Sequence, residues 1–319
     1  MSPVIERMPV LIFSPHSRCN CRCVMCDIWK VTDAQEMSAK DLQRHMASIE
    51  QLGVEWVVFT GGEPLMHSDL FRLCAILRDR GIRVSILSTG LLLERHAASI
   101  VTHADDVIVS LDGPGEIHDR IRRVPGVFAK LEAGVRAIRN IQPAFCVTAR
   151  CTVQRLNCAH LRATVSAARA LGLNGVSFLA ADLTSTAFNR PAGWSPERVS
   201  GVALTSEDLE ALESEIGALE AAGECGRFVA ESAQKLRRIA DHFRGIPQAP
   251  RCNAPWISAV VETDGTVRPC FFHPPVGRTG PDKSLLEVIN SAEAVAFRTA
   301  LDVASNPTCQ RCVCSLNWK

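Results

Sequence analysis

Short apolar runs alternate with longer amphipathic stretches through the first 181 residues of the chain. Several of the apolar runs are uninterrupted, which is typical of parallel strands buried on both faces. The stretches between them repeat apolar residues at helical spacing. The pattern predicts strands at 9–14, 56–60, 84–88, 107–111, 146–153 and 175–181, and helices at 39–52, 69–80, 92–102, 127–140 and 159–171.

Capping residues sharpen these boundaries. Ser38 and Ser68 precede the first two predicted helices as N-caps, and Gly81 and Gly172 stand where helices end. Six strand–helix units predict an α/β fold, a partial (β/α)6 TIM-like barrel. Ligands of such folds collect at the carboxyl ends of the strands.

The rest of the chain follows a different pattern. Two amphipathic helices are predicted at 205–222 and 229–243, and Asp264-Gly265 lies between two apolar runs as in a hairpin. We therefore expect a core at 1–200, a helical connector at 201–247 and a small C-terminal α+β domain at 248–319.

Composition and charge exclude several functions. With 35 Lys and Arg against 34 Asp and Glu, the net charge is +1, which favours neither nucleic acid nor acidic lipid as a partner. The first seven residues lack a signal-peptide layout, and no apolar run reaches the roughly 18–20 residues that span a bilayer. These features predict a cytoplasmic protein with no membrane segment.

Fourteen cysteines without an export signal favour metal binding over disulfides. Cys19, Cys21, Cys23 and Cys26 crowd into eight residues just after the first predicted strand. The set Cys19, Cys23 and Cys26 reads C-x3-C-x2-C. Three thiolates are one fewer than a four-iron cluster needs, so one iron would be open to another molecule.

A second cysteine group lies near the C-terminus. The predicted hairpin would bring Cys270 back near Cys252, and Cys309 and Cys312 form a C-x2-C pair with Cys314 beyond it. Four thiolates could hold either zinc or an iron–sulfur cluster. The other five cysteines are scattered along the chain and are expected to be small, buried apolar residues: Cys74, Cys146, Cys151, Cys158 and Cys225.

Polar residues follow the other predicted strands. Gly61-Gly62-Glu63-Pro64 follows the second, Ser88 ends the third, and Ser110 and Asp112 end the fourth. Arg122 lies in a charged run, 118–123, which reads either as a solvated surface or as a guanidinium fork for a carboxylate.

In this order, the motifs resemble the radical S-adenosylmethionine (SAM) enzyme superfamily over residues 8–181. The resemblance implies a [4Fe–4S] cluster on Cys19, Cys23 and Cys26, with SAM on its fourth iron. It also implies a set of cofactor-binding residues, with Gly61, Gly62 and Glu63 near the methionine ammonium and Ser88, Ser110 and Arg122 near the ribose or carboxylate. The set is Gly61, Gly62, Glu63, Pro64, Ser88, Ser110, Asp112 and Arg122.

The resemblance implies reductive cleavage of SAM to a 5′-deoxyadenosyl radical, which abstracts hydrogen from a substrate. A donor such as flavodoxin or ferredoxin would supply the electron. Two positions depart from the family pattern: Met25 stands where an aromatic residue is frequent, and Cys21 lies between two ligands, as a bystander or an alternative ligand.

The C-terminal cysteines resemble the SPASM domain and its shorter form, twitch. Cys252 and Cys270 form a C-x17-C pair with Gly265 five residues before Cys270. This implies one auxiliary [4Fe–4S] cluster on Cys252, Cys270, Cys309 and Cys312. Cys314 could replace Cys312, and zinc remains an alternative.

Only about seven residues precede the first predicted strand, with no peptide-recognition module among them. We therefore expect oxidation or epimerisation of a small sugar- or aminocyclitol-like molecule. The alternative is a maturase that modifies a peptide or protein side chain, and the remote alternative is a non-catalytic iron–sulfur electron carrier. Cys225 and Cys314 are the candidate thiol hydrogen donors for the epimerisation.

Overall fold

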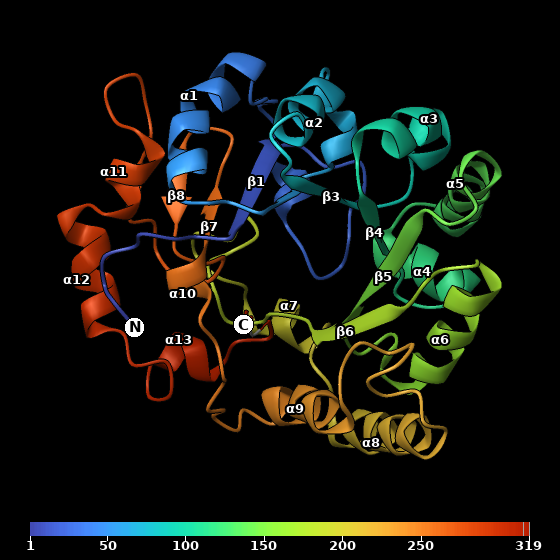
Figure 1. Ribbon diagram of the computed structural model, residues 1–319. Helices are drawn as coiled ribbons and strands as arrows, with labels where there is room; N and C mark the ends of the chain where they lie inside the picture. Colours follow the sequence, from blue (N-terminus) through green and yellow to red (C-terminus); the bar gives the residue numbers. More distant parts are fainter. Residues whose placement is uncertain (315, 319) are drawn as a thin grey trace.

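One nine-stranded sheet organises the chain, in the computed structural model, which describes residues 1–314 and 316–318. Residues 315 and 319 of the expected C-terminal domain lie outside the described residues. The strand order is β6-β5-β4-β3-β2-β1-β7-β8-β9. The six strands of the first half pair in parallel, each with the next along the chain, and curve with their helices on the outer side, as Figure 1 shows. The expected partial barrel is confirmed.

The elements of the first half are β1 (Val10–His16), α1 (Ala39–Gln51), β2 (Trp56–Gly61), α2 (Leu70–Arg78), β3 (Arg83–Ser88), α3 (Leu93–His103), β4 (Asp106–Ser110), α4 (Gly115–Arg122), α5 (Val127–Ile141), β5 (Cys146–Val153), α6 (Leu161–Ala170) and β6 (Val176–Ala180). Those of the second half are α7 (Pro196–Ser200), α8 (Ser206–Ala221), α9 (Ala233–Phe243), α10 (Ala254–Ile257), β7 (Ser258–Val261), β8 (Thr266–Arg268), β9 (Gly277–Arg278), α11 (Leu285–Ile289), α12 (Ala292–Ala300) and α13 (Pro307–Gln310).

The helix boundaries test the predicted caps. Ser38 begins α1 in a capping box with Asp41, as predicted. The prediction for Ser68 is wrong: its hydroxyl donates to Glu36, and α2 begins after Asp69 without a side-chain cap. The Ser68 hydroxyl therefore bonds to a residue far away in the sequence instead of capping the helix.

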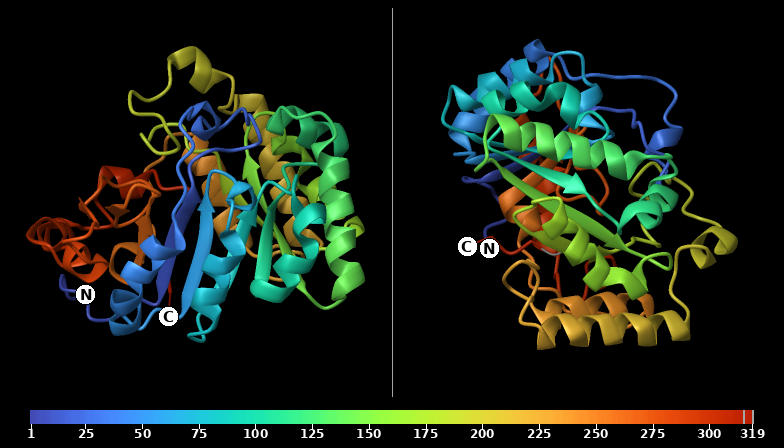
Figure 2. Two further views of the ribbon diagram at one scale, coloured as in Figure 1. Left: turned by 90° about the horizontal axis from the view of Figure 1, so that it is seen from above. Right: turned by 90° about the vertical axis from the view of Figure 1, so that its right-hand side faces the viewer.

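The C-terminal region continues the same sheet. β7 pairs in parallel with β1, and β7 and β8 form the antiparallel hairpin predicted around Asp264-Gly265. Gly265 has φ +86°, and a Cβ there would lie 2.8 Å from the Thr279 carbonyl oxygen, so the turn requires glycine. Figure 2 shows the C-terminal elements against the β1 side of the sheet.

The two faces of the sheet differ in burial. Outward positions of β5, such as Val147 and Val153, pack against the helices and are fully buried. Inward positions of β4, β5 and β6 alternate with them and keep part of their surface exposed. Burial on both faces was expected, but serine, threonine and arginine occupy several inward positions. The inner face is therefore partly open.

Two further findings concern the connector. α9 begins at Ala233 rather than at the predicted residue 229, because Val229 forms a bridge with Val176 and Ser232 caps the helix. Over residues 1–314 and 316–318, every helix is too short or too polar to cross a bilayer.

Candidate metal and cofactor site

The loop after β1 carries the first four cysteines. Its backbone is fixed to the end of α4, where Arg22 N donates to the Arg122 carbonyl at 3.0 Å and Val24 N to the Ile121 carbonyl at 2.9 Å. The charged run at 118–123 is therefore largely the helix α4, whose last turn holds the cysteine loop.

Burial and mutual repulsion control these thiols. Burial, with smaller contributions from the neighbouring thiols, raises the pKa of Cys19 and of Cys26 to about 12. A hydrogen bond from the Cys21 thiol, and then the charge of Arg122, lower the pKa of Cys23. Thiols with raised pKa become thiolates when a metal supplies the opposing charge.

The donor set fits an iron–sulfur cluster better than a single ion. Among the described residues, no three Cys, His, Asp or Glu side chains converge on one ion position. A four-iron cluster takes each thiolate on a different iron, so its ligands need not share a centre. None of the fourteen cysteines, all of them described, forms a disulfide.

The Gly61-Gly62 pair packs against the start of the cysteine loop. Gly62 N donates to the His16 carbonyl at 3.2 Å. A Cβ on Gly62 would lie 2.0 Å from the Arg18 carbonyl oxygen, and Gly61 has φ +98°. No other residue fits this approach of the β2 loop to the β1 loop.

Glu63 links the carboxyl ends of β2 and β3. Its carboxylate is fully buried and accepts from Leu65 N at 3.0 Å, Ser88 Oγ at 3.0 Å and Thr89 N at 2.6 Å. Burial raises the pKa of Glu63, and these hydrogen bonds oppose the rise. Glu63 and Ser88, expected to face SAM, thus contact each other.

Asp112 and Arg122 form a buried ion pair at 2.6 Å. Arg122 Nη1 also donates to Cys23 Sγ at 3.5 Å, and Asp112 Oδ1 accepts from Thr152 N at 2.9 Å. The guanidinium therefore connects the acidic end of β4 to a candidate cluster ligand. Ser110 lies on the inner face of β4 and is partly exposed.

The segment after β6 folds over the cysteine loop. Trp194 Nε1 donates to Asp27 Oδ2 at 2.7 Å, and Asn189 Nδ2 donates to the Asp27 carbonyl at 3.1 Å. Phe188, at φ +59°, stacks on Phe271, with ring centroids 6.4 Å apart. Residues 188–194 thus contact both cysteine regions, because Phe271 follows Cys270.

Sequence reasoning missed Asp27, since one carboxylate beside a cysteine motif carries no signal of its own. It also missed Arg190, which is 2% exposed, pairs with Asp182 and lies over the Trp194 ring at 4.5 Å. Gln154, which follows β5, is fully buried, and its amide has no hydrogen-bond partner in the described part of the chain.

The C-terminal thiols gather around α13. Burial, then the charges of Cys270 and Cys252, raise the pKa of Cys309 to about 12. His273 Nε2 lies 3.3 Å from Cys309 Sγ, another contact that the sequence did not reveal. Cys314 is exposed, and its backbone N donates to Cys312 Sγ at 3.3 Å.

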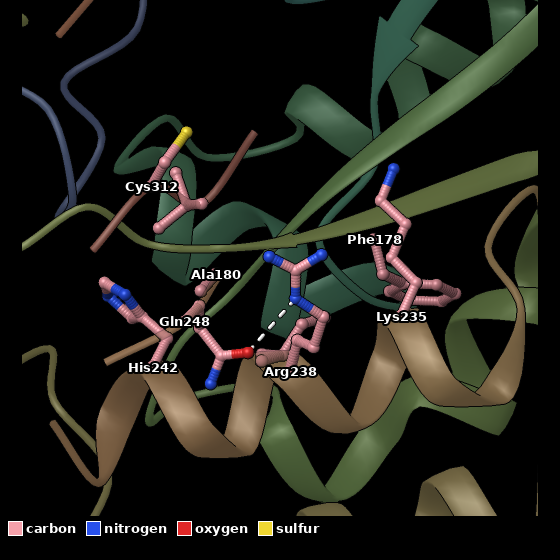
Figure 3. A pocket seen from close by; sticks show the side chains of 9 residues that line it. Phe178, Ala180, Lys235, Arg238, His242, Gln248 and Cys312 are labelled. Carbon is pink, nitrogen blue, oxygen red and sulfur yellow. Dashed lines mark hydrogen bonds between the residues drawn. The ribbon is translucent and has the colours of Figure 1, made fainter. Parts of the chain in front are cut away.

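Cys312 also lines a cleft between β6 and α9. Figure 3 shows Lys235, Arg238 and His242 along one side of α9, with Arg238 donating to Gln248. Cys225 lies elsewhere: it bridges to Val229, which pairs with Val176 at the amino end of β6. That is the opposite end of the strand from the cysteine loop, so no role is assigned to Cys225.

Two family models match separate parts of the chain. The radical SAM superfamily model matches residues 13–165, and the SPASM model, an iron–sulfur cluster-binding domain, matches residues 252–313. The second match favours iron–sulfur over zinc in the C-terminal region. The cofactors are therefore a [4Fe–4S] cluster with SAM in the core and an auxiliary iron–sulfur cluster.

Two curated relatives differ in how much of this chain their sequences match. Fe-coproporphyrin III synthase of Methanosarcina barkeri is 31% identical over 141 residues, 43% of this chain and only 35% of its own length. PqqA peptide cyclase of Ruegeria pomeroyi is 26% identical over 296 residues, 88% of this chain and 72% of its own.

A solved structure matches almost the whole fold. SuiB of Streptococcus suis, bound to SAM, superposes with a TM-score of 0.71 at 14% identity, covering 97% of this chain and 73% of that one. The two family matches and this fold agree with the motif order and with the sheet. The chain belongs to the radical SAM superfamily and carries a C-terminal SPASM domain.

Proposed function

We propose that this protein is a radical SAM enzyme that modifies a peptide or protein side chain. One observation carries the proposal: similarity to the peptide cyclase runs through 88% of the chain, whereas similarity to the coproporphyrin synthase covers 43%. The relatives thus support the peptide alternative better than the sugar-like substrate expected first.

In this proposal Cys19, Cys23 and Cys26 hold the core cluster. When bound, the reduced cluster and SAM supply a 5′-deoxyadenosyl radical that removes hydrogen from the substrate. Arg122 donates to the Cys23 sulfur and stabilises its thiolate form. Glu63, through Ser88 and Thr89, fixes the strand ends beside the cluster.

The auxiliary cluster is assigned to Cys252, Cys270, Cys309 and Cys312, with Cys314 as the substitute for Cys312. His273 lies against the Cys309 sulfur, where an N–H donor would stabilise the reduced cluster. Phe188 and Trp194 shield the space between the two cysteine regions from water, because they pack on Phe271 and Asp27.

A second candidate is chemistry on a tetrapyrrole. The highest identity among the relatives named above, 31%, belongs to the coproporphyrin synthase, and its match lies within the core. The same core could serve either substrate, because the cofactors carry the hydrogen abstraction and the remaining residues select the substrate.

The test measures 5′-deoxyadenosine formed by anaerobically reconstituted protein with SAM and dithionite. One sample receives a bacterial peptide fraction, a matched sample receives the same fraction after digestion with proteinase K, and a third receives coproporphyrin. We expect the intact peptides alone to raise 5′-deoxyadenosine above the substrate-free rate, and Cys23→Ala to abolish it. Stimulation by coproporphyrin alone would transfer the assignment to the second candidate.

A further inference from the structure

Three side chains form a row across the inner face of the sheet. Arg150 of β5 is in register with Ser110 of β4 on one side and with Ser177 of β6 on the other. Residues in register on neighbouring strands project to the same face. Ala149 and Cys151 belong to the core under the helices, so Arg150 and its two serine neighbours point to the inside of the curved sheet.

This row is accessible. Arg150, Ser110 and Ser177 each keep part of their surface exposed, whereas the alternating positions of the same strands are buried. A large cationic side chain here is unusual, because the inner positions of parallel strands are normally apolar.

Arg150 also lacks a partner. Across residues 1–314 and 316–318 its guanidinium forms no ion pair with a carboxylate, and its Nε is buried without a hydrogen bond. Two other arginines near these strands are paired: Arg83 of β3 with Asp106 at 2.7 Å, and Arg122 at the end of α4 with Asp112 at 2.6 Å. A guanidinium stays charged at every physiological pH, so Arg150 is available to bind an anion from outside the chain.

The geometry points to a substrate subsite beside the SAM site, in which Arg150 and the hydroxyl of Ser177 bind a carboxylate of the substrate, while Ser110, expected to contact SAM, lies on the other side of Arg150. The planar fork of arginine matches a carboxylate, and the Ser177 hydroxyl can donate to the same oxygens. This inference rests on the proposed function in taking the carboxylate from a peptide, either an acidic side chain or the chain terminus. The subsite would fix which residue of the peptide faces the core cluster.

The experiment uses the protein with both clusters, saturating SAM and no reductant, so that no turnover occurs and the SAM site is filled. Ligand-observed NMR titrations compare N-acetylglutamate methylamide, its glutamine analogue and N-acetylglycine. We expect the glutamate probe or N-acetylglycine to bind about tenfold more tightly than the glutamine probe, as a charge-assisted bidentate contact provides. Whichever acidic probe binds identifies the source of the carboxylate.

Arg150→Gln should abolish this preference, and Arg150→Lys, which keeps the charge but loses the fork, should reduce it severalfold. The matched control is Arg155→Gln, because Arg155 lies just beyond the same strand, is 48% exposed and pairs with Asp208. That variant should keep the preference. If Arg150→Gln does not fold, as judged by iron content and circular dichroism, the lysine variant decides.

An equal preference in wild type and Arg150→Gln overturns the inference, as does the failure of both acidic probes to bind more tightly than the glutamine probe. Loss of SAM affinity in Arg150→Gln also overturns it, since Arg150 would then belong to the SAM site. Failure of the proposed function is recognised separately, because these titrations need no 5′-deoxyadenosine formation.

Discussion

Glu63 provides the sharpest test of how the site is built. Its carboxylate could serve SAM alone, or it could hold the ends of β2 and β3 together before SAM arrives. The structure favours the second role, because Leu65 N, Ser88 Oγ and Thr89 N all donate to it. The change Glu63→Gln keeps the shape of the side chain and removes its charge.

The expected loss follows from these donors. The glutamine carbonyl can still accept from Leu65 N and Ser88 Oγ, but its amide nitrogen then faces the Thr89 N–H. One charge-assisted hydrogen bond, worth about 1.5–3 kcal/mol, is replaced by two opposed donors in a fully buried place. We expect a loss of about 3 kcal/mol, or about 4.5 °C in the unfolding midpoint of a chain of this size.

The assay is thermal unfolding of the cluster-loaded protein without SAM, under argon at a fixed scan rate. Glu55→Gln is the control, because the Glu55 side chain is 52% exposed and pairs with the exposed Arg7 at the surface. That variant should stay within about 0.5 kcal/mol of wild type. If Glu63→Gln without SAM unfolds within 1 °C of wild type, roughly a fifth of the expected shift, the bracing role is refuted.

Three further outcomes are expected. Burial lowers the pKa of His45 to about 4, so the unfolded chain binds a proton at higher pH than the folded chain does. The free energy of unfolding therefore falls as pH drops from about 6.5 towards 4. His45→Phe should remove about 2 kcal/mol of this fall between pH 7 and pH 5, measured by urea unfolding at both values. Gln154→Leu should not lower the unfolding midpoint, because its amide has no partner among the described residues, yet it should weaken binding of SAM or of the acidic probes. Asn157→Leu, which removes the donors to the Asp112 and Thr152 carbonyls, should lower the midpoint, and the reverse order would contradict the reasoning. His273→Phe should make the auxiliary cluster harder to reduce in an EPR-monitored titration while iron content stays constant; an unchanged potential would mean that the ring does not donate to Cys309.

Much of the core followed from local pattern. Apolar runs predicted all six strands, because a buried parallel strand has little freedom in composition. The motif order placed Cys19, Gly61 and Asp112 at the carboxyl ends of strands, since a repeated strand–helix unit brings those ends to one edge. The ends of some helices were predicted less accurately. Ser68 bonds to the distant Glu36 instead of capping α2, and α9 begins later than predicted because Val229 pairs with Val176 of β6.

Contacts between distant segments could not be predicted. The pairing of Asp27 with Trp194 and the stacking of Phe188 on Phe271 join residues more than 80 positions apart, and no periodicity records such distances. Likewise, the glycine pair was expected to let a ligand approach the backbone, whereas Gly62 packs against the Arg18 carbonyl of the neighbouring loop.

The sequence by itself determined the barrel class, the two cysteine groups and the family. Apolar strand patterns and ligand spacings depend only on residues that are close together in the sequence. Only the tertiary structure decided which charges are already neutralised. Arg122 is satisfied by Asp112, and Glu63 by three donors, whereas Arg150 faces the inner side of the sheet without a carboxylate in the described residues. Pairing depends on side chains that meet across strands, so the fold alone shows which residues remain to bind a substrate.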